Sequence, residues 1–213
     1  MSAQPTVYVV EDDADVRKSL KWLLRKARLN VETCPSAEQF LNSYDPQTPG
    51  CVIVDVRMPG MSGLELQQAL AERGWNIPVI VMSGHADVPT AVRAVQAGAM
   101  DFLEKPISRQ VLLDRIHQAI EQDATVRRER LHRADNQARL ARLTPRERQV
   151  MDMVVTGQTT KQIARQLDAS ARTIEVHRAR LMKKTRVDSV AELVILAIRC
   201  GVHKMSASIG TKQ

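Results

Sequence analysis

The chain has 213 residues, of which 44% are hydrophobic, 26% charged and 3% aromatic, with a formal net charge of +7. This length suggests one or two domains, and the balance of apolar and charged residues is ordinary for a folded globular protein. No apolar run approaches the ~20 residues that a membrane helix needs, so no membrane partner is expected.

The N-terminal stretch and the cysteines favour a cytoplasmic protein. The stretch MSAQPTV has neither a basic region nor an apolar core, so no secretion signal is expected. The three cysteines, at 34, 51 and 200, are widely spaced and odd in number, which fits reduced thiols better than a disulfide framework. We expect them to be small buried side chains rather than metal ligands.

The net charge is divided unevenly along the chain. Residues 1–123 hold 12 Lys/Arg and 16 Asp/Glu, a net charge of −4, whereas residues 124–213 hold 19 and 8, a net charge of +11. This asymmetry predicts two domains with different partners. The basic one is a candidate for binding nucleic acid, although a solvated basic surface would give the same charge.

The first half alternates between strands and helices. Strands are predicted at 6–10, 30–33, 51–55, 78–82 and 101–104, and helices at 13–28, 36–42, 63–73, 89–97 and 108–121. Five such alternations predict a parallel sheet covered by helices on both faces. In such sheets functional groups gather at the carboxyl ends of the strands.

The second half is predicted to be entirely helical. Residues 124–143 contain neither Gly nor Pro and form a linker helix, either separate from the preceding helix or continuous with it. Thr144 is expected to cap the next helix, with Pro145 in its first turn and Glu147 closing a capping box. Helices to about 156 and over 161–167, 171–184 and 189–199 give the helix-turn-helix pattern, and the tail 205–213 is expected to be disordered.

Acidic residues follow two of the predicted strands. Glu11 and Asp12 follow the first strand and Asp55 ends the third, and these strands are neighbours in a doubly wound sheet. Three carboxylates within a few ångströms would repel one another, and a hard divalent cation such as Mg²⁺ would relieve that repulsion. Lys105 after the fifth strand and Ser83 at the end of the fourth reach the same edge. Together these groups suit phosphoryl transfer to Asp55.

Residues 5–122 resemble the receiver domain of two-component response regulators. The resemblance rests on Val9-Val10-Glu11-Asp12-Asp13, Asp55 with Met58-Pro59-Gly60, Ser83-Gly84-His85, Gly98-Ala99 and Glu104-Lys105-Pro106. It implies an α/β doubly wound, five-stranded parallel sheet of the CheY-like type. It also implies that Asp55 accepts phosphate from a cognate sensor histidine kinase.

The same resemblance implies roles for the surrounding residues. Mg²⁺ (or Mn²⁺) would be bound by Asp12, Asp55 and the backbone carbonyl of Arg57, with Glu11 acting through water. Ser83 would be the switch hydroxyl and Phe102 the switch aromatic. Glu11 stands where the family often has aspartate. The bond between Lys105 and Pro106 is expected to be cis.

The predicted helix 171–184 is basic and carries small side chains. Ile174, His177 and Leu181 fall on one face, and the opposite side suits entry into a major groove. Arg and Lys side chains would bind phosphates, and Glu175 could accept a hydrogen bond from a cytosine amino group. His177 is either a structural residue of the helix face or a phosphate contact.

Residues 141–203 resemble the LuxR/NarL-type helix-turn-helix, and the whole chain most resembles the FixJ/StyR-like branch of response regulators. The matching stretches are 143–147, Gly157 with 161–164, and 173–178. The DNA-binding residues expected from the helix and from the resemblance are Lys161, Arg172, Thr173, Glu175, Val176, Arg178, Ala179 and Lys183.

The sequence therefore predicts a phosphorylation-activated transcription regulator rather than an enzyme. The expected domains are a receiver (1–122), a helical linker (123–142), an all-α four-helix helix-turn-helix domain (143–204) and a disordered tail (205–213). Phosphorylation would pair receivers through residues 88–116 into a homodimer that binds double-stranded promoter DNA, with RNA polymerase as a candidate further partner. At most slow self-dephosphorylation is expected.

Two alternatives differ in class. An aspartate-nucleophile phosphohydrolase would carry a second acid two residues after the nucleophile, but that position is Arg57. A regulator that binds DNA without phosphate would use the receiver only as a dimerisation module, which the intact acidic site disfavours.

Overall fold

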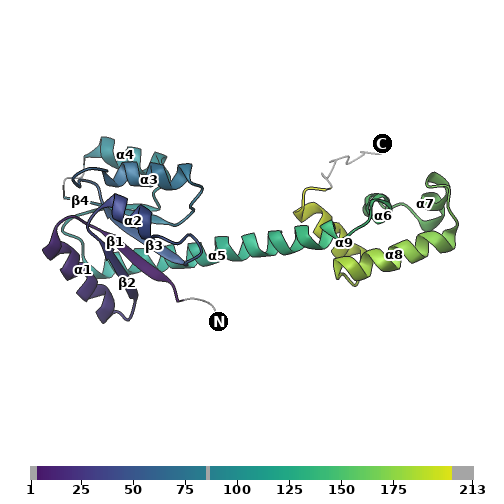
Figure 1. The fold of residues 1–213 in the computed structure, drawn as a ribbon, viewed down its shortest axis with the longest axis horizontal. Coiled ribbons are helices and arrows are strands. Elements are labelled where there is room, and N and C mark those ends of the chain that lie inside the picture. The colour runs from purple at the N-terminus through teal and green to yellow at the C-terminus, as the bar shows by residue number, and fades with distance from the viewer. Residues whose placement is uncertain (1–3, 85–86, 203–213) are drawn as a thin grey trace, which may run out of the picture. The chain divides into compact units, whose positions relative to one another are not determined.

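The computed structural model describes residues 4–84 and 87–202, which form two compact units divided between Arg127 and Arg128. The tail predicted at 205–213 and the matched residue His85 lie outside the described residues. The expected fold class is confirmed: the first unit contains a five-stranded parallel sheet in the order β2-β1-β3-β4-β5, and the second is helical (Figure 1).

The strands of the first unit are β1 (Thr6–Val10), β2 (Asn30–Cys34), β3 (Gly50–Asp55), β4 (Val79–Ser83) and β5 (Asp101–Glu104). The helices between them are α1 (Ala14–Lys26), α2 (Ala37–Ser43), α3 (Gly63–Glu72) and α4 (Val88–Gln96), and α5 (Arg109–Ala141) follows β5. The predicted bounds agree within one or two residues, except that α5 runs 20 residues beyond Glu121 as one helix of 33. The linker is therefore the continuation of α5.

Helices cover both faces of the sheet, and the central strands are mostly apolar and buried on both sides. In β1, β3 and β4 every residue is buried. Side chains such as Val7 and Ile53 pack against α1 and α5, whereas Val10 and Val54 pack against α2, α3 and α4. Two-sided burial of this kind is typical of parallel sheets.

The second unit contains α6 (Pro145–Val155), α7 (Thr160–Gln166), α8 (Ala171–Thr185) and α9 (Val190–Arg199). The predicted capping box of α6 is present: the Thr144 hydroxyl accepts from the Glu147 N–H at 3.3 Å, and Glu147 Oε2 accepts from the Thr144 N–H at 2.8 Å. Leu140, near the end of α5, is buried in the core that these helices share.

Candidate functional site

The sheet brings four strand ends to one edge. Strand β1 pairs in parallel with β3, where Val10 lies opposite Val54, and β3 pairs with β4, where Asp55 lies opposite Met82. Strand β4 pairs with β5, where Ser83 lies opposite Glu104. Since parallel strands end at the same edge, the residues at and just beyond these ends become neighbours in space.

Lys105 bridges the two buried carboxylates at this edge. Its Nζ donates to Glu11 Oε2 at 2.7 Å and to Asp55 Oδ1 at 2.5 Å. The Lys105 N–H donates to the Ser83 carbonyl at 2.8 Å, and the bond to Pro106 is cis, as expected. Glu11 and Asp55 are 2% and 6% exposed, so the contact is largely shielded from solvent. Three of the residues predicted to converge therefore do so.

Burial and charge compete in setting the pKa values here. Burial raises the pKa of Glu11, and this effect outweighs the opposing hydrogen bond and charge of Lys105. Burial by itself lowers the pKa of Lys105, but its hydrogen bonds to Asp55 and Glu11 together raise it above the ordinary value. The ammonium group thus stays charged and is held between two carboxylate oxygens.

Asp12 is placed differently from the other acids. It is exposed, and within the described residues no hydrogen bond or ion pair joins its carboxylate to Lys105, Glu11 or Asp55. Its carbonyl and that of Glu11 accept from Arg17 Nη1 at 3.0 and 2.7 Å, which fixes the backbone of the acidic pair. The sequence did not single out Arg17, although its position one turn into a helix after the acids could have suggested this contact.

The donors at this edge suit a magnesium ion bound mainly by water. Across residues 4–84 and 87–202 no group of three or more Asp, Glu, His or Cys side chains is arranged to hold a metal ion. Mg²⁺ usually keeps several waters and needs only one or two carboxylates in addition. The exposed Asp12 carboxylate and Asp55, whose Oδ2 accepts from the Arg57 N–H at 2.7 Å, fit that requirement.

The two predicted switch residues lie on adjacent strands. Ser83 is 2% exposed at the end of β4. Phe102 on β5 is half-buried and packs against the core shared with α2, α3 and α4. Val81, two residues before Ser83, pairs with Phe102, so both side chains belong to the β4–β5 edge of the sheet.

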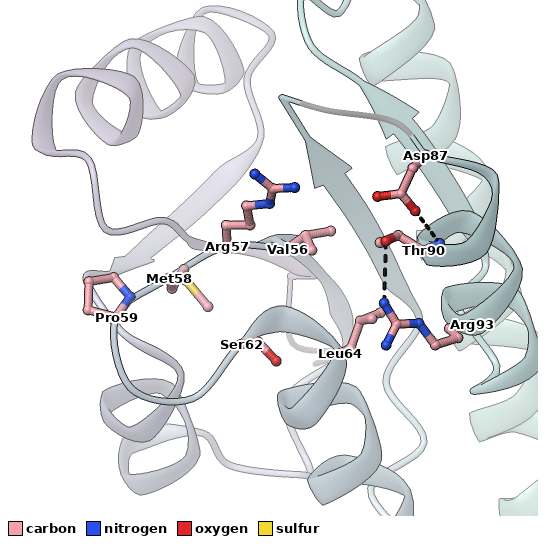
Figure 2. Close-up of a pocket in the computed structure, with 9 residues that line it drawn as sticks. All are labelled: Val56, Arg57, Met58, Pro59, Ser62, Leu64, Asp87, Thr90 and Arg93. Carbon is pink, nitrogen blue, oxygen red and sulfur yellow. Dashed lines mark hydrogen bonds between the residues drawn. The ribbon is translucent and has the colours of Figure 1, made fainter.

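A groove of about 590 Å³ opens beside Asp55 and is shown in Figure 2. Arg57 follows β3, and Arg93 lies on α4, where its Nη2 donates to the Thr90 hydroxyl at 3.4 Å. Asp87 caps α4 by accepting from the Thr90 N–H at 2.6 Å. Hydrogen bonds to Thr90 are the main reason that the pKa of Asp87 is lowered. The groove thus presents two cationic side chains and one firmly ionised acid.

Helices α7 and α8 form the predicted helix-turn-helix. The turn between them includes Asp168 at φ 46°, a left-handed conformation that Asp tolerates better than most residues. Arg146 Nη2 donates to the Leu167 carbonyl at 2.5 Å, which ties the turn to α6. Ile174 and Leu181 are fully buried, as their placement on one face of the helix predicts.

The residues expected to bind DNA lie mainly on the outer surface of this unit. Seven are exposed: Lys161, Arg172, Thr173, Glu175, Val176, Ala179 and Lys183. Arg178 is half-buried, as is His177, whose Nδ1 has no hydrogen-bond partner among the described residues. The half-burial of His177 favours a structural position on the helix face. Apart from Lys161, which lies on α7, the exposed residues lie on α8 and give it a basic surface with small side chains.

One further buried ion pair lies in each unit, between distant residues in the second unit and within one helix in the first. Lys184 Nζ donates to Glu147 Oε2 at 2.6 Å, and Glu147 is buried. Burial of Glu147 opposes its ionisation, but the Lys184 pair and the hydrogen bonds from Thr144 outweigh it and lower its pKa to about 2. In the first unit, Arg127 binds Asp123. Neither pair was predicted from the sequence.

A receiver-type sheet edge combined with a helix-turn-helix unit defines a class of protein, the DNA-binding response regulators. Residues 7–117 match the model of the response regulator receiver domain, and residues 141–197 match that of the bacterial regulatory proteins of the luxR family. The chain belongs to the response regulators that carry a LuxR-type DNA-binding domain.

Two curated relatives are transcriptional regulatory proteins. The chain is 43% identical to the protein FixJ of Bradyrhizobium diazoefficiens over 202 residues, which cover 95% of this chain and 98% of that protein. It is 41% identical to TdiR of Thauera aromatica over 198 residues, covering 93% of this chain and 87% of that protein.

A solved structure of the response regulator StyR has a TM-score of 0.88 and 43% identity, covering 92% of this chain and all of that one. The chain is thus a transcription regulator. None of the described helices is long and apolar enough to cross a membrane.

Proposed function

We propose that Asp55 is the phosphate acceptor of this regulator and that a sensor histidine kinase is the donor. A carboxylate oxygen of Asp55 would attack the phosphorus of a phosphohistidine as the bond from phosphorus to nitrogen breaks and the imidazole leaves. The observation that carries this proposal is the contact of Lys105 Nζ with both Glu11 and Asp55 at the carboxyl edge of the sheet. A half-buried lysine that is held between two buried carboxylates is suited to stabilise a developing phosphoryl charge.

Phosphorylation adds negative charge to a site that already has more carboxylates than cations. We infer that Mg²⁺ (or Mn²⁺) is bound by Asp12, Asp55 and the Arg57 carbonyl, with Glu11 acting through a water. When bound, the ion would neutralise the phosphoryl oxygens and orient the donor. Within the protein, Lys105 would shift from Asp55 Oδ1 toward a phosphoryl oxygen while retaining Glu11.

The phosphorylated state would be transmitted along β4 and β5. The Ser83 hydroxyl would donate to a phosphoryl oxygen, and Phe102 would move into the space that opens beside it. The surface over 88–116 carries the exposed apolar side chains Val88, Val92, Val95 and Val111. We propose that this surface forms the receiver homodimer, because burial of such side chains stabilises an interface.

The second unit would bind the major groove through α8. Arg172, Arg178, Lys161 and Lys183 would contact phosphates, and Thr173, Glu175, Val176 and Ala179 would face the bases. A dimer would read two half-sites of promoter DNA, and RNA polymerase is a candidate further partner. A regulator that acts on bacterial genomic DNA works in the cytoplasm, where its three free cysteines would remain reduced.

The assignment is tested by substituting the acceptor. The Asp55→Asn variant, incubated with acetyl phosphate and Mg²⁺, should form no acid-labile phosphoprotein. The matched control Asp114→Asn changes an exposed acid on α5 and should be phosphorylated normally. Phosphate on Asp55→Asn at the same yield as wild type would refute the proposal. A DNA affinity unchanged by acetyl phosphate and Mg²⁺ would favour the phosphate-independent alternative.

The alternative function, that of an aspartate-nucleophile phosphohydrolase, has little support at this site. The second acid that an aspartate-nucleophile phosphohydrolase needs is replaced by Arg57, whose side chain is exposed. We therefore expect only slow self-dephosphorylation of Asp55. Turnover of a simple phosphate ester faster than one event in many minutes would contradict this expectation.

A further inference from the structure

The loop between β3 and α3 spans residues 56–62 and carries the backbone carbonyl of Arg57. Backbone hydrogen bonds fix both ends of this loop. At its start the Val56 N–H donates to the Met82 carbonyl at 2.8 Å, and at its end the Gly63 N–H donates to the Val56 carbonyl at 3.1 Å. The loop is therefore held in place where it leaves the sheet and where it enters α3.

The middle of the loop is held by one side chain from α2. Glu38 Oε1 accepts from the Met61 N–H at 2.9 Å, although the two residues are 23 positions apart in the chain. Among the described residues, no other hydrogen bond reaches the backbone of residues 58–61. The conformation of this part of the loop therefore depends on Glu38.

The glycine before Met61 allows this contact. Gly60 has φ +75°, a left-handed conformation that glycine adopts without strain. A Cβ at this position would lie 2.9 Å from Glu38 Oε1. Glycine thus permits both the turn of the backbone and the close approach of the carboxylate.

Helix α2 gives Glu38 a fixed base. Ser36 caps the helix, and Ala37 and Phe40 are fully buried in the core of the first unit. Hydrogen bonds from its own backbone N–H and then from the Met61 N–H lower the pKa of Glu38. The carboxylate is therefore ionised at neutral pH and acts as an acceptor.

We propose that Glu38 is a positioning residue for the magnesium site. By accepting from the Met61 N–H it holds the loop in the conformation that presents the Arg57 carbonyl to the ion. This inference rests on the proposed role of that carbonyl. The competing explanation is that Glu38 only stabilises α2, as an acid in the first turn of a helix does through its charge.

Two substitutions separate the hydrogen bond from the charge. Glu38→Met keeps the length of the side chain and removes both, whereas Glu38→Gln removes the charge and keeps an oxygen that can accept from the Met61 N–H. The control is Gln39→Met, which changes the next residue of the same helix at an exposed position.

Ion binding is measured directly on the full-length, unphosphorylated protein. Electron paramagnetic resonance of free Mn²⁺ gives the affinity for Mn²⁺, and displacement of Mn²⁺ gives the affinity for Mg²⁺. Glu38→Met should bind both ions about 10-fold more weakly, the lower end of the range for groups that orient metal ligands. Glu38→Gln should stay within about 2-fold of the wild type, and Gln39→Met should bind like the wild type.

Phosphorylation by acetyl phosphate gives a second readout. Glu38→Met should need about 10-fold more Mg²⁺ to reach half of its maximal rate. At saturating Mg²⁺ it should reach the wild-type rate, because Asp55 and Lys105 are unchanged. A substitution that disordered the site would lower the maximal rate instead.

The inference is overturned if Glu38→Met binds Mg²⁺ as tightly as the wild type. It is also overturned if Glu38→Gln is weakened as much as Glu38→Met, because the loss then comes from the charge. Should circular dichroism show that Glu38→Met folds poorly, Glu38→Ala provides a second variant without the acceptor, and the same results apply to it. A wild-type protein without Mg²⁺-dependent phosphorylation would contradict the proposed function itself, whereas unchanged variants beside an active wild type contradict this inference alone.

Discussion

Arg127 stabilises the first unit through a cluster that joins α5 to the loop before β3. Its Nε donates to Asp123 Oδ2 at 2.7 Å. Its Nη1 donates to the carbonyls of Pro46 and Gln47 at 3.0 and 3.1 Å, and its Nη2 donates to that of Thr48 at 2.8 Å. We predict that Arg127→Met, which keeps the aliphatic stem and the helix propensity, destabilises the receiver strongly.

The expected decrease in the free energy of unfolding follows from the buried Asp123 carboxylate, which the substitution leaves without its charged partner. The Asp123 side chain is 2% exposed and would keep only the Gly50 N–H at 2.9 Å as a partner. Removing one member of a buried ion pair costs about 3–5 kcal/mol. The Arg127 side chain is 23% exposed, so water can partly replace it. We therefore expect Arg127→Met to lower the free energy of unfolding by about 3 kcal/mol, at the lower end of that range.

The assay is urea unfolding of the full-length chain in the Trp22→Phe background, followed by the fluorescence of Trp75. The second unit contains no tryptophan, so this signal reports the receiver alone. Arg128→Met, on the next residue of the same helix, is exposed and should change the free energy of unfolding by less than about 0.5 kcal/mol.

A double variant separates the charge from the packing. Adding Asp123→Asn to Arg127→Met removes the unpaired buried charge, so the double variant should be more stable than Arg127→Met alone. If Arg127→Met lowers the free energy of unfolding by less than about 1 kcal/mol, the prediction is wrong. It is also wrong if the effects of the two substitutions on the free energy of unfolding simply add in the double variant.

Three further predictions concern charged groups elsewhere. The pKa of Glu147 is about 2 in the folded protein against an ordinary 4.5, so its pairing with Lys184 stabilises the second unit above pH 4.5 and is lost as the pH falls toward 2. Unfolding curves followed by circular dichroism should show that the free energy of unfolding of the second unit falls by at most roughly 3 kcal/mol over that interval. The Glu147→Gln variant should lack this pH dependence. Lys105→Met should slow phosphorylation of Asp55 by acetyl phosphate about 100-fold or more, measured by phosphoprotein gel shift. Lys183→Ala should weaken specific and non-specific DNA binding alike in fluorescence anisotropy, and reduce the salt slope by about 1.

The features that the sequence predicted well are those encoded locally. The continuous apolar run ending in Asp55 identifies a strand buried on both faces, and the rule that parallel strands end at one edge brings Glu11 and Lys105 beside it. Thr144 and Glu147 stand three residues apart, so their capping box can be recognised directly. These predictions need only short spacing and one rule of topology.

The features that were not predicted depend on partners far apart in the chain. Arg127 lies about 80 residues from the loop carbonyls that it binds, and in the sequence it is one of many arginines in a basic helix. Lys184 and Glu147 are 37 residues apart and belong to different helices. For Asp12 a contact was predicted that the structure does not show. Its position next to Glu11 suggested that its carboxylate would lie beside Lys105, but the carboxylate is exposed. Side-chain direction after a strand end is not fixed by spacing.

Helix α5 contributes to two separate hydrophobic cores. Ile116 and Ala119 pack in the receiver, whereas Leu140 packs among α6, α8 and α9, and its carbonyl accepts from Arg148 Nη2 at 3.0 Å. A recombinant fragment cut at residue 143 would leave out Leu140 and open a void in the second core. A start at least one helical turn upstream of Leu140 would retain that side chain together with the backbone that orients it. The boundary between the two units therefore lies inside α5 rather than at the end of that helix.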